Sequence, residues 1–134
     1  MATTTAGAWT KLTVNSKHLV GTSAETTVLA NTADNHVSPT ITEDLGNKKI
    51  LVGINVTVAF ADVASTLIVE GSADGTNWAT LATASSDTTP NVTGVKYYLA
   101  DLSIIYAPYY RLNHNANGLN LSTSGKLKFI YATT

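Results

Sequence analysis

A tight turn between two short apolar or small-residue segments constrains the fold of this chain more than any other feature of its sequence. The segment Thr66–Val69 is apolar, Ser72–Asn77 is rich in Ser, Asp, Gly and Asn, and the chain continues through Trp78 into Ala79–Ala82. Asp and Asn tolerate left-handed backbone conformations and hydrogen-bond their own backbone, and Gly75 takes a positive φ without a Cβ penalty. The segment predicts a β-hairpin, which directs the chain towards an antiparallel β fold.

Strict alternation of apolar residues predicts the core. The segment Lys49–Phe60 alternates with a period of two, which is the signature of a half-buried strand. Lys126–Ala132 repeats the pattern, with Lys126 and Lys128 opposite its apolar side chains. The residues expected to be buried together are Ile50, Val52, Ile54, Val56, Val58, Phe60, Leu127 and Phe129.

Seven further segments have the composition of strands, and clusters of turn-forming residues separate them. These segments are Thr10–Val14, Thr26–Ala30, Ser38–Thr42, Thr66–Glu70, Trp78–Thr83, Val95–Leu102 and Tyr109–His114. Short strands with this spacing predict an all-β chain folded as a single antiparallel β-sandwich or jelly roll of about eight strands. We expect no helix longer than about ten residues, which is close to the mean helix length.

The composition indicates one soluble domain with a nearly neutral surface. The chain has 134 residues and a net charge of −1, and its charged fraction is 13%, against about 25% in typical proteins. It lacks the basic stripe of a nucleic-acid-binding protein, so no nucleic-acid partner is expected. No segment approaches the roughly 20 apolar residues that span a bilayer, so no membrane partner is expected either.

Catalytic motifs are missing from the sequence. The three histidines His18, His36 and His114 are far apart and do not have the spacing of metal ligands on one element. The chain has no cysteine, no nucleophile elbow, no phosphate-binding loop and no dinucleotide fingerprint. Asp74 and Asn77 supply too few oxygen ligands for a calcium site. We therefore expect no enzyme activity, no cofactor and no metal.

Three motifs together resemble those of small β-sandwich structural proteins of tailed bacteriophages, head decoration (cement) proteins above all. They are Gly-Ser-x-Asp-Gly-x-x-Trp at 71–78, Tyr-x-Leu-x-Asp at 97–101 and Ala-Pro-Tyr-Tyr-Arg-Leu at 107–112. The resemblance implies a virion protein on the capsid surface that binds the major capsid protein and forms a homo-oligomer, with a trimer favoured. Similar hairpins occur in discoidin-like carbohydrate-binding modules. The alternative is therefore a carbohydrate- or receptor-binding module of a phage fibre or tail.

Two segments are candidates for an assembly interface. Residues 1–9 are small and polar before Trp9, which suggests an N-terminal arm ahead of a sandwich domain at 10–134. Tyr109 and Arg111 share one face of a predicted strand, and Tyr and Arg carry much of the binding energy at interfaces. In the resembling sandwiches an Arg at this position is often structural. The candidate residues are Ala2, Thr3, Thr4, Thr5, Trp9, Tyr109 and Arg111.

Overall fold

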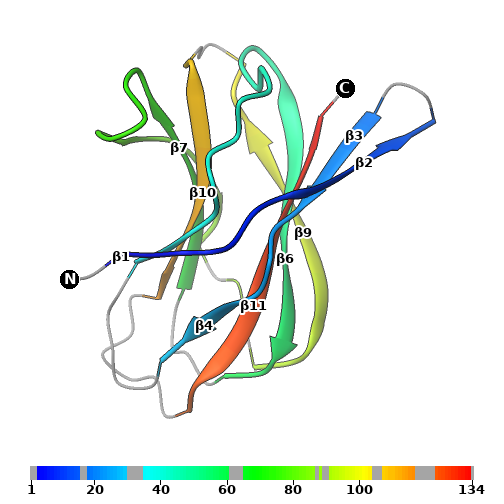
Figure 1. Cartoon of the computed structure of the whole chain (residues 1–134), viewed down its shortest axis with the longest axis vertical. Coiled ribbons are helices and arrows are strands. Elements are labelled where there is room, and N and C mark those ends of the chain that lie inside the picture. The colour runs from blue at the N-terminus through cyan, green and yellow to red at the C-terminus, as the bar shows by residue number, and fades with distance from the viewer. Residues whose placement is uncertain are drawn as a thin grey trace.

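The computed structural model describes residues 3–15, 18–29, 35–60, 65–86, 88, 91–103, 107–116 and 123–133. These residues form eleven strands and no helix, and hence no helix that could cross a membrane (Figure 1). The strands are β1 (Thr3–Thr5), β2 (Thr10–Val14), β3 (His18–Thr22), β4 (Thr26–Val28), β5 (Asn35–Val37), β6 (Lys49–Val58), β7 (Ser65–Ser72), β8 (Ala79–Ser85), β9 (Gly94–Asp101), β10 (Tyr109–Ala116) and β11 (Gly125–Thr133).

The strands form two sheets that pack face to face, as expected for a sandwich. The five-stranded sheet has the order β1-β5-β10-β7-β8, and the six-stranded sheet has the order β2-β3-β11-β6-β9 with β4 paired to β11. All ladders are antiparallel except that between β1 and β5. The described residues thus form more strands than the eight or so expected: β1, β3 and β5 had not been predicted at these positions, and β1, β4 and β5 have only three residues each.

The core lies between the two sheets and confirms most of the sequence prediction. Seven of the eight residues expected in it are buried in one cluster, with Leu67, Val69 and Leu112 of the opposite sheet. The alternation in β11 is also as predicted: Leu127, Phe129 and Tyr131 are fully buried.

Val58 is the exception, and the prediction that it is buried was wrong. The register between β6 and β11 shifts at this point, so that Leu127 pairs with Val56 but Lys126 pairs with Val58. Directly paired residues in a ladder share a face of the sheet, and Lys126 points away from the core. Val58 therefore points outward with it and is 46% exposed. A bulge of this kind ends the alternation that the sequence shows.

A second difference concerns the strand expected at Ser38–Thr42. The strand lies earlier, at Asn35–Val37, where it pairs with both β1 and β10. Within 38–42 only Ile41 forms a bridge, to Tyr110. Pro39 lacks the N–H that a ladder needs, which is consistent with the early end of β5.

Residues 3–9, expected to form an arm, run along the sandwich. Thr3–Thr5 is the edge strand β1, and the N–H of Ala6 donates to the carbonyl of Val37 at 2.8 Å. Ala6 is buried in the core. Met1 and Ala2 lie outside the described residues, and a role of this segment in assembly stays a prediction.

The hairpin predicted from the sequence is confirmed as β7 and β8. Asp74 organises its turn: Oδ1 accepts the N–H groups of Thr76 and Asn77, both at 2.8 Å, and Oδ2 accepts the amide of Asn77. These donors hold the pKa of Asp74 well below its usual range. Gly75 has a φ of 77°, the left-handed conformation expected for it. The carboxylate of Asp74 is thus committed to the turn.

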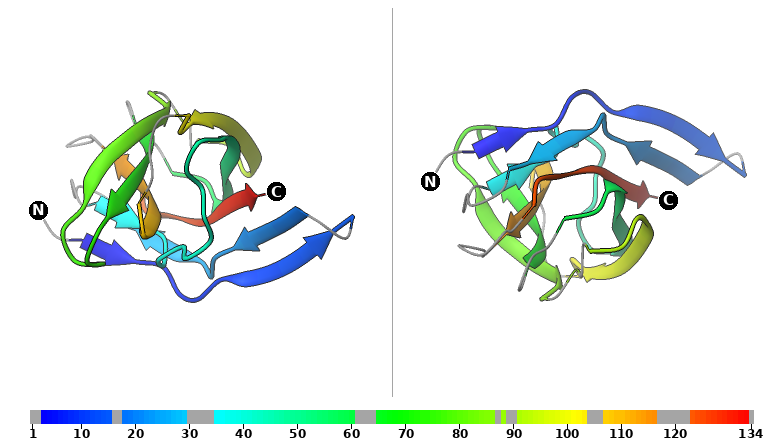
Figure 2. Two further views of the ribbon diagram at one scale, coloured as in Figure 1. Left: turned by 90° about the horizontal axis from the view of Figure 1, so that it is seen from above. Right: turned by 90° about the horizontal axis from the view of Figure 1, so that it is seen from below.

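The hairpin formed by β2 and β3 projects beyond the rest of the sandwich (Figure 2). Its base is held by Glu43, which accepts Lys11 Nζ at 2.7 Å and the Tyr131 hydroxyl at 2.8 Å. Burial works against ionisation of Glu43, but these two hydrogen bonds hold the pKa of its carboxyl below the usual range. Trp9 packs its edge on Tyr131, with ring centroids 4.7 Å apart.

Candidate interaction surfaces

Four of the candidate interface residues share the outer face of the five-stranded sheet. Thr3 pairs with Asn35 of β5, which in turn pairs with Asn115 of β10. Thr5 is linked in the same way to residue 113 of β10, and directly paired residues share a face of the sheet. Tyr109 and Arg111 continue the same side of β10, because residues two apart share a face. Hydroxyl and amide side chains are the most numerous on this side of the sheet, which we call the polar face: Thr3, Thr5, Thr66, Asn35, Asn113 and Asn115. Val37 and Ile68 lie on the same side, and Val37 and Asn113 are buried.

The other candidates lie elsewhere or outside the described residues. Thr4 pairs with buried His36 and so points to the opposite side of the sheet from Thr3. Trp9 is partly buried, and its indole N–H donates to the carbonyls of Pro39 and Thr40 at 3.2 and 3.1 Å. Ala2 is not described. The structure therefore groups Thr3 and Thr5 with Tyr109 and Arg111, and separates them from Trp9.

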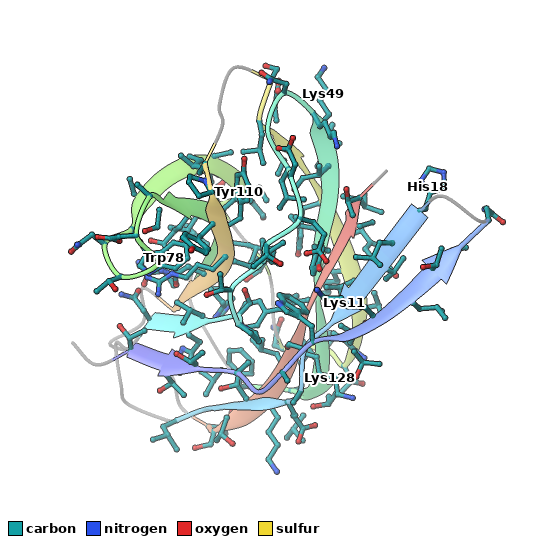
Figure 3. The ribbon with its side chains drawn as sticks, turned by 45° about the horizontal axis from the view of Figure 1, so that its top comes forward. Lys11, His18, Lys49, Trp78, Tyr110 and Lys128 are labelled. Carbon is teal, nitrogen blue, oxygen red and sulfur yellow. The ribbon has the colours of Figure 1, made fainter. Side chains whose placement is uncertain are left out.

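Arg111 is engaged within the chain itself. Its Nε donates to Glu70 Oε1 at 2.7 Å, and its guanidinium carbon lies 4.4 Å from the centroid of the Trp78 ring. Trp78, labelled in Figure 3, immediately precedes β8. The amide of Asn113 donates to the same Glu70 oxygen at 3.2 Å. Glu70 is only 8% exposed. The cluster ties β7, β10 and the entry to β8 together, and an interface role for Arg111 stays a prediction.

A second surface, which the sequence did not reveal, is the outer face of the six-stranded sheet. Successive ladders align Leu12 with Val20, Val20 with Ala132, and Leu51 with Leu99. Ile130 pairs with Gly53, which in turn pairs with Tyr97. We call this surface the apolar face, and its members are Leu12, Val14, Val20, Leu51, Val95, Tyr97, Leu99, Ile130 and Ala132.

Much of the apolar face is open to solvent. Leu12 is 64% exposed, Leu99 61% and Tyr97 56%. A signal for it was present in Val95–Leu102, where both faces of the strand carry apolar residues. That pattern is expected when both sides of a strand are covered. The sandwich covers only one of them.

Charged residues lie at the rim of the apolar face. Lys49 pairs with Asp101 at one end of the sheet, and Lys128 lies beside Asn55 on the other side of the apolar residues. Hydrogen bonds from Ser103 and the nearby charge of Lys49 lower the pKa of Asp101. At the end of the face near Lys49, a pocket of about 400 Å³ opens between the projecting hairpin and β6; its lining includes His18, Leu51 and Ala132.

Comparisons with protein families, with curated proteins and with solved structures found no match to this chain. A function therefore has to be inferred from the two outer faces and from the sequence motifs. In the part of the chain that the structure describes, no three His, Asp or Glu side chains gather into a metal-binding group.

Two histidines lie next to each other in the core, behind the polar face. His36 and His114 pair across β5 and β10, with ring centroids 6.4 Å apart. His114 is fully buried against the edge of Phe60, and its Nε2 lies 3.3 Å from the Thr88 hydroxyl. Burial, with a smaller contribution from the charge of His36, lowers the pKa of His114 to about 3.

Burial of His114 makes folding sensitive to mild acid. A histidine with a pKa near 6.5 when unfolded and about 3 when folded binds its proton only on unfolding, so its stabilising effect is complete above pH 6.5 and is lost as the pH falls. From pH 7 to pH 5 we expect a loss of about 2 kcal/mol from His114, at roughly 1.4 kcal/mol per pH unit. Urea unfolding at pH 7 and at pH 5 measures this loss of unfolding free energy. Carboxylates contribute little to the pH dependence of stability in this range.

The control for this prediction is a histidine outside the core. His114→Gln should flatten the dependence of unfolding free energy on pH between 5 and 7, whereas His18→Gln, on the projecting hairpin, should leave it as in the wild type. Equal slopes for the wild type and His114→Gln would show that His114 is not the group responsible.

Proposed function

We propose that this chain is a structural virion protein that binds the outside of a phage capsid and stabilises it. The observation that carries the proposal is a sandwich whose two broad outer faces are nearly uncharged and differ in character, one polar and one apolar. Broad sheet faces suit protein–protein contact, and the concave site beside Lys49 and Leu51 lies at the end of the apolar face and not on the polar face. The sequence motifs supply the class of partner, the major capsid protein.

The polar face is the better candidate for the capsid contact. Interfaces formed between proteins that first fold separately are about as polar as ordinary surface, and aromatic residues and Arg are enriched at their centres. Thr3, Thr5 and Tyr109 lie on this face, and Thr3 and Thr5 belong to its edge strand β1. A protein that binds only the assembled shell shifts the equilibrium away from disassembly by mass action.

A carbohydrate- or receptor-binding role is the alternative. Sugar recognition usually needs an exposed aromatic platform, and both tryptophan rings of this chain are engaged. Trp78 lies under Arg111, and Trp9 packs on Tyr131. Tyr97 is exposed, but it lies in the middle of β9 on the apolar face and not at a loop end of the sandwich. These contacts favour the capsid-binding role.

Co-sedimentation with phage heads that lack this protein tests the proposal. We expect the wild type to sediment with expanded heads and to raise the temperature at which they break. Thr5→Asp, which puts a charge on the polar face, should weaken this binding. Thr13→Asp is the matched control, because Thr13 belongs to β2 of the other sheet and points away from Leu12 and Val14.

Two outcomes would contradict the proposed capsid role or its assignment to the polar face. If the wild type fails to bind heads but binds sugars on a glycan array, the receptor-binding alternative replaces the capsid role. If it binds heads and Thr5→Asp and Thr13→Asp bind as well as the wild type, the polar face is not the contact.

A further inference from the structure

We propose that the apolar face is covered by a second copy of this chain, in a two-fold dimer formed sheet against sheet. The contact would exist in solution without any capsid. It extends the proposed function by assigning the two faces to different partners, and it does not depend on that function being correct.

The apolar character of the face favours a partner that is present from the time of folding. Interfaces between permanently associated subunits are more hydrophobic than those between proteins that meet later. Contiguous exposed apolar surface is also a liability for a free monomer, because it promotes aggregation. Leu12 and Leu99 lie on the two edge strands of the sheet, and each is more than half exposed. A second copy is the one partner that is always available.

The charges at the rim fit self-association. Lys49 and Asp101 lie side by side, and Lys128 lies across the apolar residues from them. In a two-fold contact residue i of one copy meets residue j of the other, and j meets i. A rim with both signs can therefore be satisfied by a second copy of itself, and an apolar centre with a polar rim is the usual anatomy of an interface.

The ring of Tyr97 is available to a partner near the centre of the face. A Cβ on Gly53 would lie 2.5 Å from the carbonyl oxygen of Lys96 and 3.0 Å from Cδ1 of Tyr97, so glycine leaves room for the strand and the ring beside it. Tyr97 is 56% exposed, and aromatic residues are enriched at the centres of interfaces.

The projecting hairpin also points to a covering partner. Every residue of β2 is exposed, and the hairpin extends past the end of the sandwich (Figure 2). A two-stranded hairpin on its own is only marginally stable in water. Leu12 and Val14 continue the apolar face onto this hairpin, so a second copy that covers the face would also support it.

Light scattering coupled to size-exclusion chromatography tests the dimer in the absence of heads. We expect the wild type to have twice the 14.1 kDa mass of one chain. Leu99→Asp and Leu12→Asp, on opposite edges of the sheet, should each give a folded monomer, with the circular dichroism of the wild type. Leu29→Asp is the matched control, because Leu29 is 52% exposed but follows β4 and is not a member of the apolar face.

Each other outcome contradicts the dimer. A monomeric wild type at tens of micromolar would overturn the proposal, and so would a dimer that both apolar-face variants leave intact. A trimeric mass would overturn the two-fold pairing. Because no head is present, the result is independent of the co-sedimentation experiment, and either proposal can fail while the other stands.

Discussion

Replacing Val56 with aspartate is expected to abolish folding. Val56 is 1% exposed in the middle of the core and pairs with Leu127. An unpaired carboxylate in such a site costs several kcal/mol, which is comparable to the total stability of about 5 to 15 kcal/mol for a domain. Circular dichroism and thermal unfolding of the purified variant measure the result, and we expect loss of the cooperative transition.

Leu51→Asp is the matched control for this substitution. Leu51 is on the same strand, but it points to the outer face and is 44% exposed. The same charge there should leave the sandwich folded. Soluble Val56→Asp protein that unfolds cooperatively would show that this side of β6 is not the core.

Replacing Arg111 with alanine is expected to destabilise the fold by about 3 kcal/mol, the lower end of the cost of breaking a buried ion pair. The change leaves Glu70 nearly buried, with Asn113 as its remaining donor on the polar face, and it removes the cation from the Trp78 ring. Urea unfolding at pH 7 measures the loss. Glu70→Gln combined with Arg111→Ala should recover part of it, because the uncompensated charge is then removed.

Lys126→Ala is the comparison for Arg111→Ala. Lys126 lies 3.7 Å from Glu25, with both side chains largely in solvent. Such surface pairs contribute about 0 to 1 kcal/mol. Equal effects of the two substitutions would mean that the Arg111 pair contributes no more than an ordinary surface pair.

The sequence predicted the parts of the fold that depend on local patterns. Alternation in β6 and β11 identified two strands that contribute to the core, because the side-chain period of a strand is visible within one segment. The turn at Asp74 and Gly75 was predictable for the same reason: each residue there acts on its own backbone. Neither prediction required knowledge of strand order.

What the sequence did not predict depends on pairing between distant strands. Val58 is exposed because of a register shift against β11, and nothing near Val58 indicates that shift. The strand at Asn35–Val37 exists because β1 and β10 flank it. The same holds for the apolar face: the apolar outer residues of β6 and β9 form a surface only because Leu51 pairs with Leu99.

The position of β11 in its sheet has a consequence for how the protein is made. β11 follows β3, β4 and β6 in the sequence, yet it lies in the middle of its sheet and pairs with all three. While the ribosome still holds residues 125–133, β3 and β6 have no strand between them, and one side of the core is missing. Pairing over such long sequence separations is slow. Until residues 125–133 have left the exit tunnel, the six-stranded sheet stays unfinished, so folding of this half is completed only after β11 has emerged.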